Sequence, residues 1–478
     1  MTGKNESRPI VVWLRNDLRL DDNPALAHAA ETGAPVIVVY VLEDETKGVR
    51  PLGGAHRWWL HHSLDGFSKD LEKIGGALVL RRGEGEGEIA AIVEEAGAGA
   101  IYLNRRYEPG DHDLEGRLRK TLPNVEVESF TANLLHEPDS LRTKTGGFYK
   151  VYTPFREALM SGSEPRDPID APTKLNSATK RVKSETLKTL DLLPTKPDWS
   201  GGIAADWTPG EAAALRRFKR FCKESLKDYE AGRNKPPEDA TSRMSPHLRF
   251  GEVSPYRLWH LATEAQRSGK GVETFRSELI WRDFNYHLLF NKADLPDRNF
   301  NERFDKLSWR RAKAELTNWQ KGLTGYPIVD AGMRQLWTTG WLHNRVRMIV
   351  GSFLTRDLLI DWKAGESWFW DTLVDGDPAS NTSQWQWIAG TGADPQPFFR
   401  IFNPITQSEK FDPDGVYIRR YVPELKKLPT EWIHAPWSAP AAVLDKAGIT
   451  LGKTYPKPMV DHGEARDRAL AAYAETRN

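Results

Sequence analysis

Ile10-Val11-Val12-Trp13-Leu14 and Val36-Ile37-Val38-Val39-Tyr40-Val41-Leu42 are the two apolar runs that decide the fold of the first third of the chain. Between them, Asn23-Pro24 is typical of a helix start, because Asn caps free N–H groups and Pro fits the first helical position. Gly33 is typical of a helix end. Short runs rich in Val and Ile, separated by helices, indicate strands of a parallel sheet that is covered on both faces.

The same alternation continues to residue 130. Three further strand-like runs are Ala77–Leu80, Ala100–Leu103 and Val125–Phe130. The helix-like segments between the strands are Pro24–Glu31, Gly54–Ile74, Glu88–Ala96 and Asp111–Thr121. Five such units predict a doubly wound α/β domain over residues 1–130, with a five-stranded parallel sheet.

The usual nucleotide-binding motifs are missing from this domain. The segment after the first run, Arg15–Arg19, contains neither G-x-G-x-x-G nor a Walker lysine. Gly83–Glu88 alternates Gly with Glu and would repel a phosphate. We therefore do not expect a dinucleotide bound in the Rossmann manner.

The composition changes after this domain. Residues 131–207 are predicted to be a long linker, because 161–202 are rich in Ser, Thr, Pro, Lys and Asp with little periodicity. Thr208-Pro209-Gly210-Glu211 resembles a capping box, and helical periodicity follows almost to the end. We expect an all-α domain over residues 208–478.

Composition limits the possible chemistry. The 478 residues include 67 Lys and Arg against 66 Asp and Glu, and one cysteine, Cys222. A single cysteine excludes a disulfide framework and metal sites that need several thiolates. The sequence has no H-E-x-x-H or G-x-S-x-G signature, which disfavours hydrolysis by zinc or by a triad. No metal is expected, since Asp375 and Asp377 alone supply too few ligands.

Charge and hydropathy bear on partners and location. Residues 1–160 carry 20 basic and 25 acidic side chains (net −5), so the rest carries 47 and 41 (net +6). A mildly basic second part suits an anionic partner, although an ordinary solvated surface has a similar balance. The start of the chain lacks an apolar run long enough for a signal or membrane segment. We expect a soluble, cytoplasmic monomer.

Three segments carry residues suited to chemistry. In Tyr229–Arg233 and Thr241–Pro246, hydroxyls precede a helix start, which favours either a phosphate site or an ordinary N-cap loop. In the second segment, Glu278 and Arg282 share a helix face with Trp281. That face is either a surface ion pair beside a packed Trp or a carboxylate beside an aromatic plate.

The third segment combines Trp341–Met348, Asp375–Asn381 and Trp385-Gln386-Trp387. In a helix the last two Trp side chains point in nearly opposite directions, about 200° apart, whereas in a strand they share a face. The Asp-Gly-Asp-Pro sequence beside basic helix residues offers buried acid–base pairing around a cofactor, or a structured turn.

Together these segments resemble the photolyase/cryptochrome family of flavoproteins, most closely its cyclobutane pyrimidine dimer (CPD) DNA photolyases. The resemblance extends from Val11–Leu20 to about Trp437 and is densest from Thr324–Arg334 through Phe398–Pro404. It implies that the α/β domain binds an antenna chromophore and that the helical domain holds FAD.

The resemblance also implies roles for individual residues. Arg347 and Asp375 match the ion pair beside the flavin ring, Asp377 a neighbouring contact, and Asn381 the residue that faces flavin N5. An amide there favours a reduced anionic flavin, because a carboxylate would repel the anion. The residues implied to bind FAD are Tyr229, Thr241, Ser242, Met244, Ser245, Arg282, Asn344, Arg347, Asp375, Asp377 and Asn381.

The residues implied to be catalytic are Glu278, Trp281, Asn344, Met348 and Trp387. They match CPD photolyases, whereas six-four photolyases place His at the positions of Asn344 and Met348. Plant cryptochromes commonly replace the cavity Trp and the N5-facing Asn. Both are present here, which favours a photolyase. A cryptochrome-like blue-light photoreceptor is the alternative function.

The implied activity is light-dependent repair of damaged DNA. Excited reduced FAD donates an electron to a dimer that has left the duplex, the cyclobutane ring splits, and the electron returns. Trp281 and Trp387 would grip the dimer, Glu278 would hydrogen-bond its base edge, and Arg233 and Arg345 would contact phosphates.

Two further sites follow from the resemblance. Trp385, Trp362 and Trp309 match the relay that carries electrons from the surface to oxidised FAD. Glu108 lies near the family's antenna cleft. The antenna expected first is 5,10-methenyltetrahydrofolate, with a deazaflavin or a second flavin as alternatives.

Overall fold

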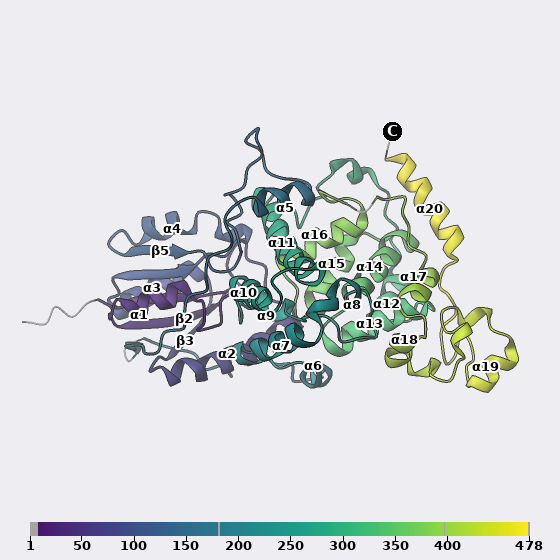
Figure 1. Ribbon diagram of the computed structural model, residues 1–478, viewed down its shortest axis with the longest axis horizontal. Helices are drawn as coiled ribbons and strands as arrows, with labels where there is room; N and C mark the ends of the chain where they lie inside the picture. Colours follow the sequence, from purple (N-terminus) through teal and green to yellow (C-terminus); the bar gives the residue numbers. More distant parts are fainter. Residues whose placement is uncertain (1–7, 180–181, 396, 477–478) are drawn as a thin grey trace, which may run out of the picture.

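A computed structural model describes residues 8–179, 182–395 and 397–476. The α/β part lies at one end of an elongated molecule and the helical part at the other (Figure 1). The sheet contains β1 (Ile10–Leu14), β2 (Val36–Leu42), β3 (Leu78–Arg82), β4 (Ala100–Asn104) and β5 (Glu126–Phe130). All pairs are parallel, in the order β3-β2-β1-β4-β5, which confirms the predicted doubly wound sheet.

Alternate side chains of β1 enter different cores. Val12 packs in the cluster that includes α1 (Pro24–Glu31) and α2 (Gly54–Lys73). Its neighbour Val11 packs in the cluster with α3 (Gly85–Ala96) and α4 (Leu114–Thr121). Because successive strand side chains point to opposite faces, a continuously apolar strand is what a sheet covered on both faces requires.

Two predicted helix starts are wrong by three residues. α3 begins at Gly85 rather than Glu88, because the Glu84 side chain accepts hydrogen bonds from the N–H groups of Glu86 and Gly87. α4 begins at Leu114 rather than Asp111, because Pro109–Asp111 forms a separate 3₁₀ turn. Glu84 thus belongs to a cap that the Gly-Glu alternation concealed.

The predicted linker contains two helices that the sequence reading missed, α5 (Tyr152–Met160) and α6 (Gly201–Asp206). Between them the chain is largely irregular and follows the α/β part: Val36 N–H donates to the Asn176 carbonyl at 2.7 Å. α5 lies beside α11 (Lys270–Asn291) in the helical part (Figure 1). The linker therefore contributes side chains to the helical part.

The helical part begins with α7 (Glu211–Glu224), where the predicted capping box is wrong. The N-cap is Gly210, and the Glu211 carboxylate accepts hydrogen bonds from the N–H groups of Leu20 and Asp21. The other helices are α8 (Tyr229–Gly232), α9 (Ser245–Arg249), α10 (Pro255–Ala265), α12 (Lys313–Gln320), α13 (Pro327–Thr339), α14 (Asn344–Ser352), α15 (Trp362–Thr372), α16 (Pro378–Ala389), α17 (Pro404–Phe411), α18 (Val416–Tyr421), α19 (Ala441–Ala447) and α20 (His462–Glu475).

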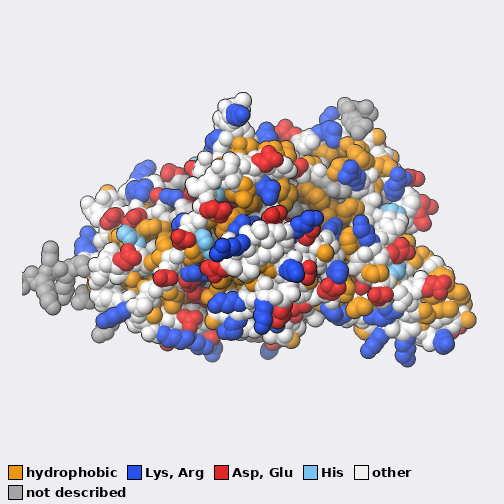
Figure 2. All heavy atoms as spheres, in the orientation of Figure 1, with side chains coloured by type: hydrophobic (Ala, Val, Ile, Leu, Met, Phe, Trp, Pro, Cys, Tyr) orange, Lys and Arg blue, Asp and Glu red, His pale blue; other side chains and the backbone are white. Residues whose placement is uncertain are grey.

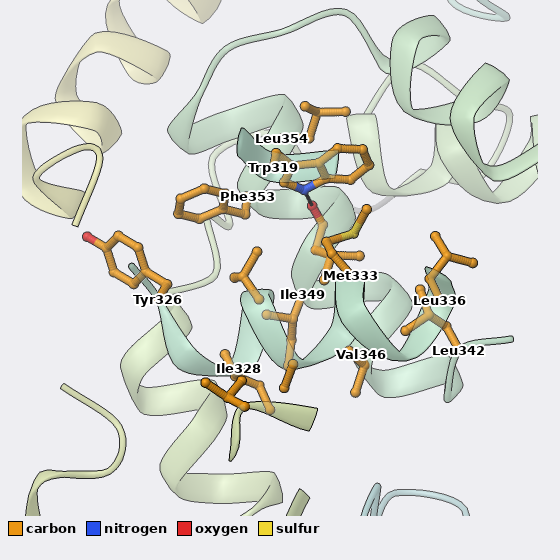
Figure 3. Packing of buried hydrophobic residues seen from close by; sticks show 14 of the residues in the cluster. Trp319, Tyr326, Ile328, Met333, Leu336, Leu342, Val346, Ile349, Phe353 and Leu354 are labelled. Carbon is orange, nitrogen blue, oxygen red and sulfur yellow. Dashed lines mark hydrogen bonds between the residues drawn. The ribbon is translucent and has the colours of Figure 1, made fainter. Parts of the chain in front are cut away.

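A large apolar cluster holds α13, α14 and α16 together. Figure 3 shows Met333 of α13 and Ile349 of α14 in this cluster with Trp319, whose indole N–H donates to the Val350 carbonyl at 3.1 Å. The cluster fixes α14 and α16, which face the cavity described below.

The two parts meet where α2 approaches α15. A Cβ at Gly53 would lie 2.3 Å from the Trp370 carbonyl oxygen, so only glycine permits this approach. Beside it, Arg50 forms two hydrogen bonds with the Glu366 carboxylate. None of the helices in the described part of the chain combines the length and the apolar character needed to cross a bilayer.

Candidate functional site

A cavity of about 760 Å³ opens in the helical part, lined by residues of α8, α11, α14 and α16 and of the segments before α9 and α16. Figure 2 shows hydrophobic side chains gathered in the recessed centre of this face, over α11 and α16. The volume is typical of sites for small molecules and cofactors.

All the residues predicted to bind FAD line this one cavity. They come from five separate stretches of sequence, namely Tyr229, Thr241, Ser242, Met244, Ser245, Arg282, Asn344, Arg347, Asp375, Asp377 and Asn381. The predicted catalytic and DNA-contacting residues line it too, namely Glu278, Trp281, Met348, Trp387, Arg233 and Arg345. The structure thus brings together two predicted sets in a single site.

The acidic loop before α16 is held by hydrogen bonds. Asp375 is buried and pairs with Arg347, whose Nη2 atom lies 2.7 Å from Oδ2. Asp377 caps α16 by accepting from the N–H groups of Ala379 and Ser380. The Tyr286 hydroxyl donates to Asp377 at 2.7 Å. This is the buried acid–base pairing that the sequence left open against a simple turn.

Asn381 is oriented by Glu366, a residue that the sequence reading missed. The Asn381 Nδ2 atom donates to the Glu366 carboxylate at 2.8 Å and to its carbonyl at 3.0 Å. The Oδ1 atom is therefore the acceptor that Asn381 can present to the cavity. Because Arg50 clamps Glu366, the orientation of this amide depends on a residue of the α/β part.

Residues 241–245 form a segment of the cavity wall that leads into α9, whose first residue is Ser245. Arg217 of α7 donates to the carbonyls of Thr241 and Ser242, at 3.2 and 3.3 Å, and so fixes the segment from behind. The hydroxyls of Thr241, Ser242 and Ser245 are on residues that line the cavity. These groups are suited to binding phosphate oxygens, and that role stays a prediction.

The more exposed part of the cavity carries Glu278 and Trp281 on α11. The Glu278 carboxylate accepts a hydrogen bond from Arg233 Nη1 at 2.6 Å. Burial raises the pKa of Glu278, although the positive charge of Arg233 opposes the rise. Glu278, which is predicted to contact a base edge, and Arg233, which is predicted to contact a phosphate, are thus bonded to each other.

Tyr152 of α5 is a second residue that the sequence reading missed. Its ring stacks on Trp281, with ring centroids 3.6 Å apart and planes at 8°. Its hydroxyl donates to the Ser277 carbonyl at 2.9 Å. Tyr152 covers one face of the indole, which leaves at most the other face for a ligand.

Two other residues that are predicted to contact DNA, Trp387 and Arg345, lie on different helices. Trp387 of α16 is half-buried in the cavity wall. Arg345 of α14 bonds the Asn234 side chain at 2.5 Å and lies over the Phe411 ring. Arg345 has no carboxylate partner among the described residues, so its charge is available to an anion.

The three tryptophans of the predicted relay share the apolar cluster, and only Trp385 of them lines the cavity. Trp385 is 4% exposed and packs against Phe369 at 4.9 Å between centroids. Trp362 is fully buried and donates to Asn299 at 2.9 Å, whereas Trp309 is half-buried. Trp309 is thus the most exposed of the three, and the relay itself stays a prediction.

Glu108 lies outside this cavity, in a buried ionic network of the α/β part. Arg106 pairs with Glu43 at 2.6 Å and with Asp111 at 2.8 Å. Burial raises the pKa of Glu108, opposed by the charges of Arg106 and Arg249. Its predicted antenna role stays a prediction.

In the described residues, no group of three or more His, Cys, Asp or Glu side chains is arranged to hold a metal ion.

Comparisons with known proteins identify the family. Residues 10–173 match the family model for DNA photolyase, and residues 275–475 match the model for the FAD-binding domain of DNA photolyase. The chain is 53% identical over 473 residues to a deoxyribodipyrimidine photo-lyase of Agrobacterium fabrum, covering 98% of both chains. This chain belongs to the photolyase/cryptochrome family.

Two more relatives span the two branches of this family. A bacterial class III photolyase from Agrobacterium tumefaciens has a crystal structure that matches with a TM-score of 0.96 and 52% identity, covering 100% of this chain and 99% of the other. Cryptochrome-1 of Arabidopsis thaliana is 36% identical, over 97% of this chain and 70% of its own. The FAD-binding domain supports FAD as the cofactor, and the cavity lining offers the donors and room that FAD needs.

Proposed function

We propose that this member of the photolyase family repairs cyclobutane pyrimidine dimers in DNA, using light and reduced FAD. One observation carries the proposal: a single cavity is lined both by the flavin-binding set and by Trp281, Trp387, Glu278 and Met348. Asp375, Asp377 and Asn381 are buried, whereas Trp281, Trp387 and Met348 are half-buried. A dimer entering from solvent would therefore meet the indoles before the acids.

The indoles would hold the dimer by stacking. Trp281 comes from α11 and Trp387 from α16, two helices that pack together. Stacking of bases on aromatic side chains contributes about 1–3 kcal/mol per base. Tyr152 holds the Trp281 ring in place, so less entropy is lost when the dimer binds.

Glu278 and Arg233 would act in sequence. A DNA phosphate beside the cavity competes with Glu278 for the Arg233 guanidinium. Once Arg233 is withdrawn, burial favours the protonated Glu278 carboxyl, which can donate a hydrogen bond to a carbonyl on the dimer. Arg345 supplies a second cation that no acid among the described residues neutralises.

The buried residues would set the environment of the cofactor. When bound, reduced FAD supplies the electron on excitation by light. Asn381 presents an acceptor oxygen whose orientation Glu366 fixes, and the Arg347–Asp375 pair holds charges of both signs in the wall.

An antenna pigment, for which we propose methenyltetrahydrofolate, would be identified by the absorption spectrum of the purified protein.

The test is illumination of the reduced protein with three DNA duplexes, containing a CPD, a six-four photoproduct or no lesion. We expect selective binding and repair of the CPD duplex, and at least tenfold weaker binding of it by Trp387→Ala with FAD retained. The cryptochrome-like alternative is favoured by the Arabidopsis relative. It predicts normal flavin photoreduction with every lesion left intact, which would contradict repair.

A further inference from the structure

A second pocket lies on the other side of the 241–245 segment. Its volume is about 420 Å³, and its walls come from α7, the end of α6 and residues 243–247. Four of its lining residues are arginines: Arg216, Arg217, Arg220 and Arg243. Figure 2 shows Lys and Arg side chains gathered on the lower part of this face, where Figure 1 places α7.

The pocket keeps a positive charge after its internal pairs are counted. Asp206 pairs with Arg243, Asp239 pairs with both Arg217 and Arg220, and Glu224 pairs with Arg220. Four arginines against these three carboxylates give 4 − 3, or +1. Arg216 has no ion pair or side-chain hydrogen bond among the described residues. The pocket therefore presents more guanidinium groups than its own acids can satisfy.

The pKa of Asp239 indicates the same excess of positive charge. Burial would raise the pKa of Asp239, but the hydrogen bond from Arg217 and the charges of Arg217, Arg243 and Arg220 outweigh burial and lower it. An acid with a lowered pKa marks a region of positive potential. An anion placed in the pocket would be attracted by the same arginines, in competition with Asp239.

Two of the arginines are held rigidly. Arg217 donates to Asp239 and to the carbonyls of Thr241 and Ser242. The Arg243 guanidinium lies 3.9 Å from the centroid of the Trp207 ring, and its Nε atom is buried without a partner. Its backbone has φ +55°, a conformation that costs about 1 kcal/mol or more for a residue with a side chain. Arg217 and Arg243 thus form a fixed part of the pocket, whereas Arg216 and Arg220 are exposed side chains that line it.

The pocket is distinct from the flavin cavity. Arg243 is the lining residue that the two share, and the chain from Thr241 to Ser245 forms the wall between them. The residues we propose for the dimer, such as Trp281 and Glu278, line the flavin cavity and not the basic pocket. A ligand in the basic pocket would therefore occupy a separate site.

We propose that this basic pocket binds a small anion carrying two or more linked phosphate groups, such as a nucleoside triphosphate. Guanidinium forks pair bidentately with phosphate oxygens, and converging arginines favour a compact polyanion over an isolated charge. A concave site of this volume suits a small ligand, whereas a duplex presents its phosphates on a convex surface. The site goes beyond dimer repair, because no residue proposed for repair contributes to it.

The test is calorimetric titration of the FAD-loaded protein with inorganic tripolyphosphate in the dark. We expect binding to the wild type and at least tenfold weaker binding to the double variant Arg216→Gln/Arg220→Gln, since each loses a charge-assisted contact. The matched control is Lys219→Gln/Lys223→Gln, which removes the same charge from exposed positions of α7 outside the pocket. It should bind tripolyphosphate as the wild type does. No binding to the wild type, or equal loss in both variants, would overturn the proposal.

A second arm separates a free anion from the DNA backbone. The affinity of both double variants for undamaged duplex is measured under the same conditions, and we expect them to be equal. If only Arg216→Gln/Arg220→Gln weakens duplex binding and tripolyphosphate does not bind, the pocket is a DNA contact and the proposal fails. Because neither arm uses light or a lesion, these outcomes are independent of dimer repair.

Discussion

The Arg233 guanidinium lies 2.6 Å from the Glu278 carboxylate across the flavin cavity wall, and the two side chains are 23% and 33% exposed. Each has a different predicted partner in the DNA complex, a phosphate for Arg233 and a base edge for Glu278. In the free protein the two groups are therefore paired with each other. Binding of DNA would have to separate them.

Arg233→Gln should raise the pKa of Glu278, because it removes the positive charge that opposes the effect of burial. Infrared titration of the Glu278 carboxyl, assigned by its loss in Glu278→Gln, would measure the change. Arg345→Gln is the control, since Arg345 is also a cavity arginine but bonds Asn234 rather than Glu278. An unchanged Glu278 midpoint in Arg233→Gln would refute the coupling.

Tyr152→Ala should weaken binding of CPD-containing DNA by about 2- to 12-fold, because an aromatic pair contributes about 0.5–1.5 kcal/mol beyond its buried area. Tyr152→Phe keeps the stack on Trp281 and should bind the lesion as the wild type does. Fluorescence anisotropy with labelled duplexes would measure both. Equal losses in the two variants would instead assign the effect to the hydroxyl that bonds Ser277.

Trp385→Phe should slow photoreduction of oxidised FAD at least tenfold, while chemically reduced protein still repairs dimers. Trp385 is the member of the predicted relay that lines the cavity. Transient absorption after a light pulse would follow the reduction. Trp432→Phe, in the same apolar cluster, serves as the control. Photoreduction at the wild-type rate in Trp385→Phe would show that electrons leave by another path.

Asp283→Asn should remove part of the pH dependence of stability. Burial raises the pKa of Asp283 to about 7 from an ordinary 3.8, although the charge of Arg282 opposes the rise. Between these values the folded state holds a proton that the unfolded state has lost, so the wild type loses stability as pH rises, by at most about 4 kcal/mol. Urea unfolding from pH 4 to pH 7 should show a flatter profile in the variant. A profile parallel to that of the wild type would contradict the shifted pKa.

The sequence predicts those parts of the molecule whose causes are local. The bounds of β1 and β2 follow from continuous apolar runs, and α1 follows from Asn23-Pro24 and its end near Gly33. The capping box at Thr208–Glu211 fails because the Glu211 carboxylate bonds Leu20 and Asp21, which are far away in the sequence. Local patterns cannot report such a competing partner.

The same limit applies to the site. Family motifs predict the residues that line the cavity, but the contacts of Tyr152 with Trp281 and of Arg50 with Glu366 cross more than a hundred positions. No spacing rule indicates them, because they arise from the packing of the linker and the α/β part on the helices. Only the folded structure shows these contacts.

The recovery of thymine absorbance is the most direct measurement of the central claim. The reduced protein is mixed with an oligonucleotide containing one CPD and exposed to blue light, with a dark sample and Glu278→Ala as references. Our account predicts that the wild type restores both thymines in light alone, and that Glu278→Ala restores them at least several-fold less efficiently. Intact dimers after illumination of the flavin-loaded wild type would contradict it.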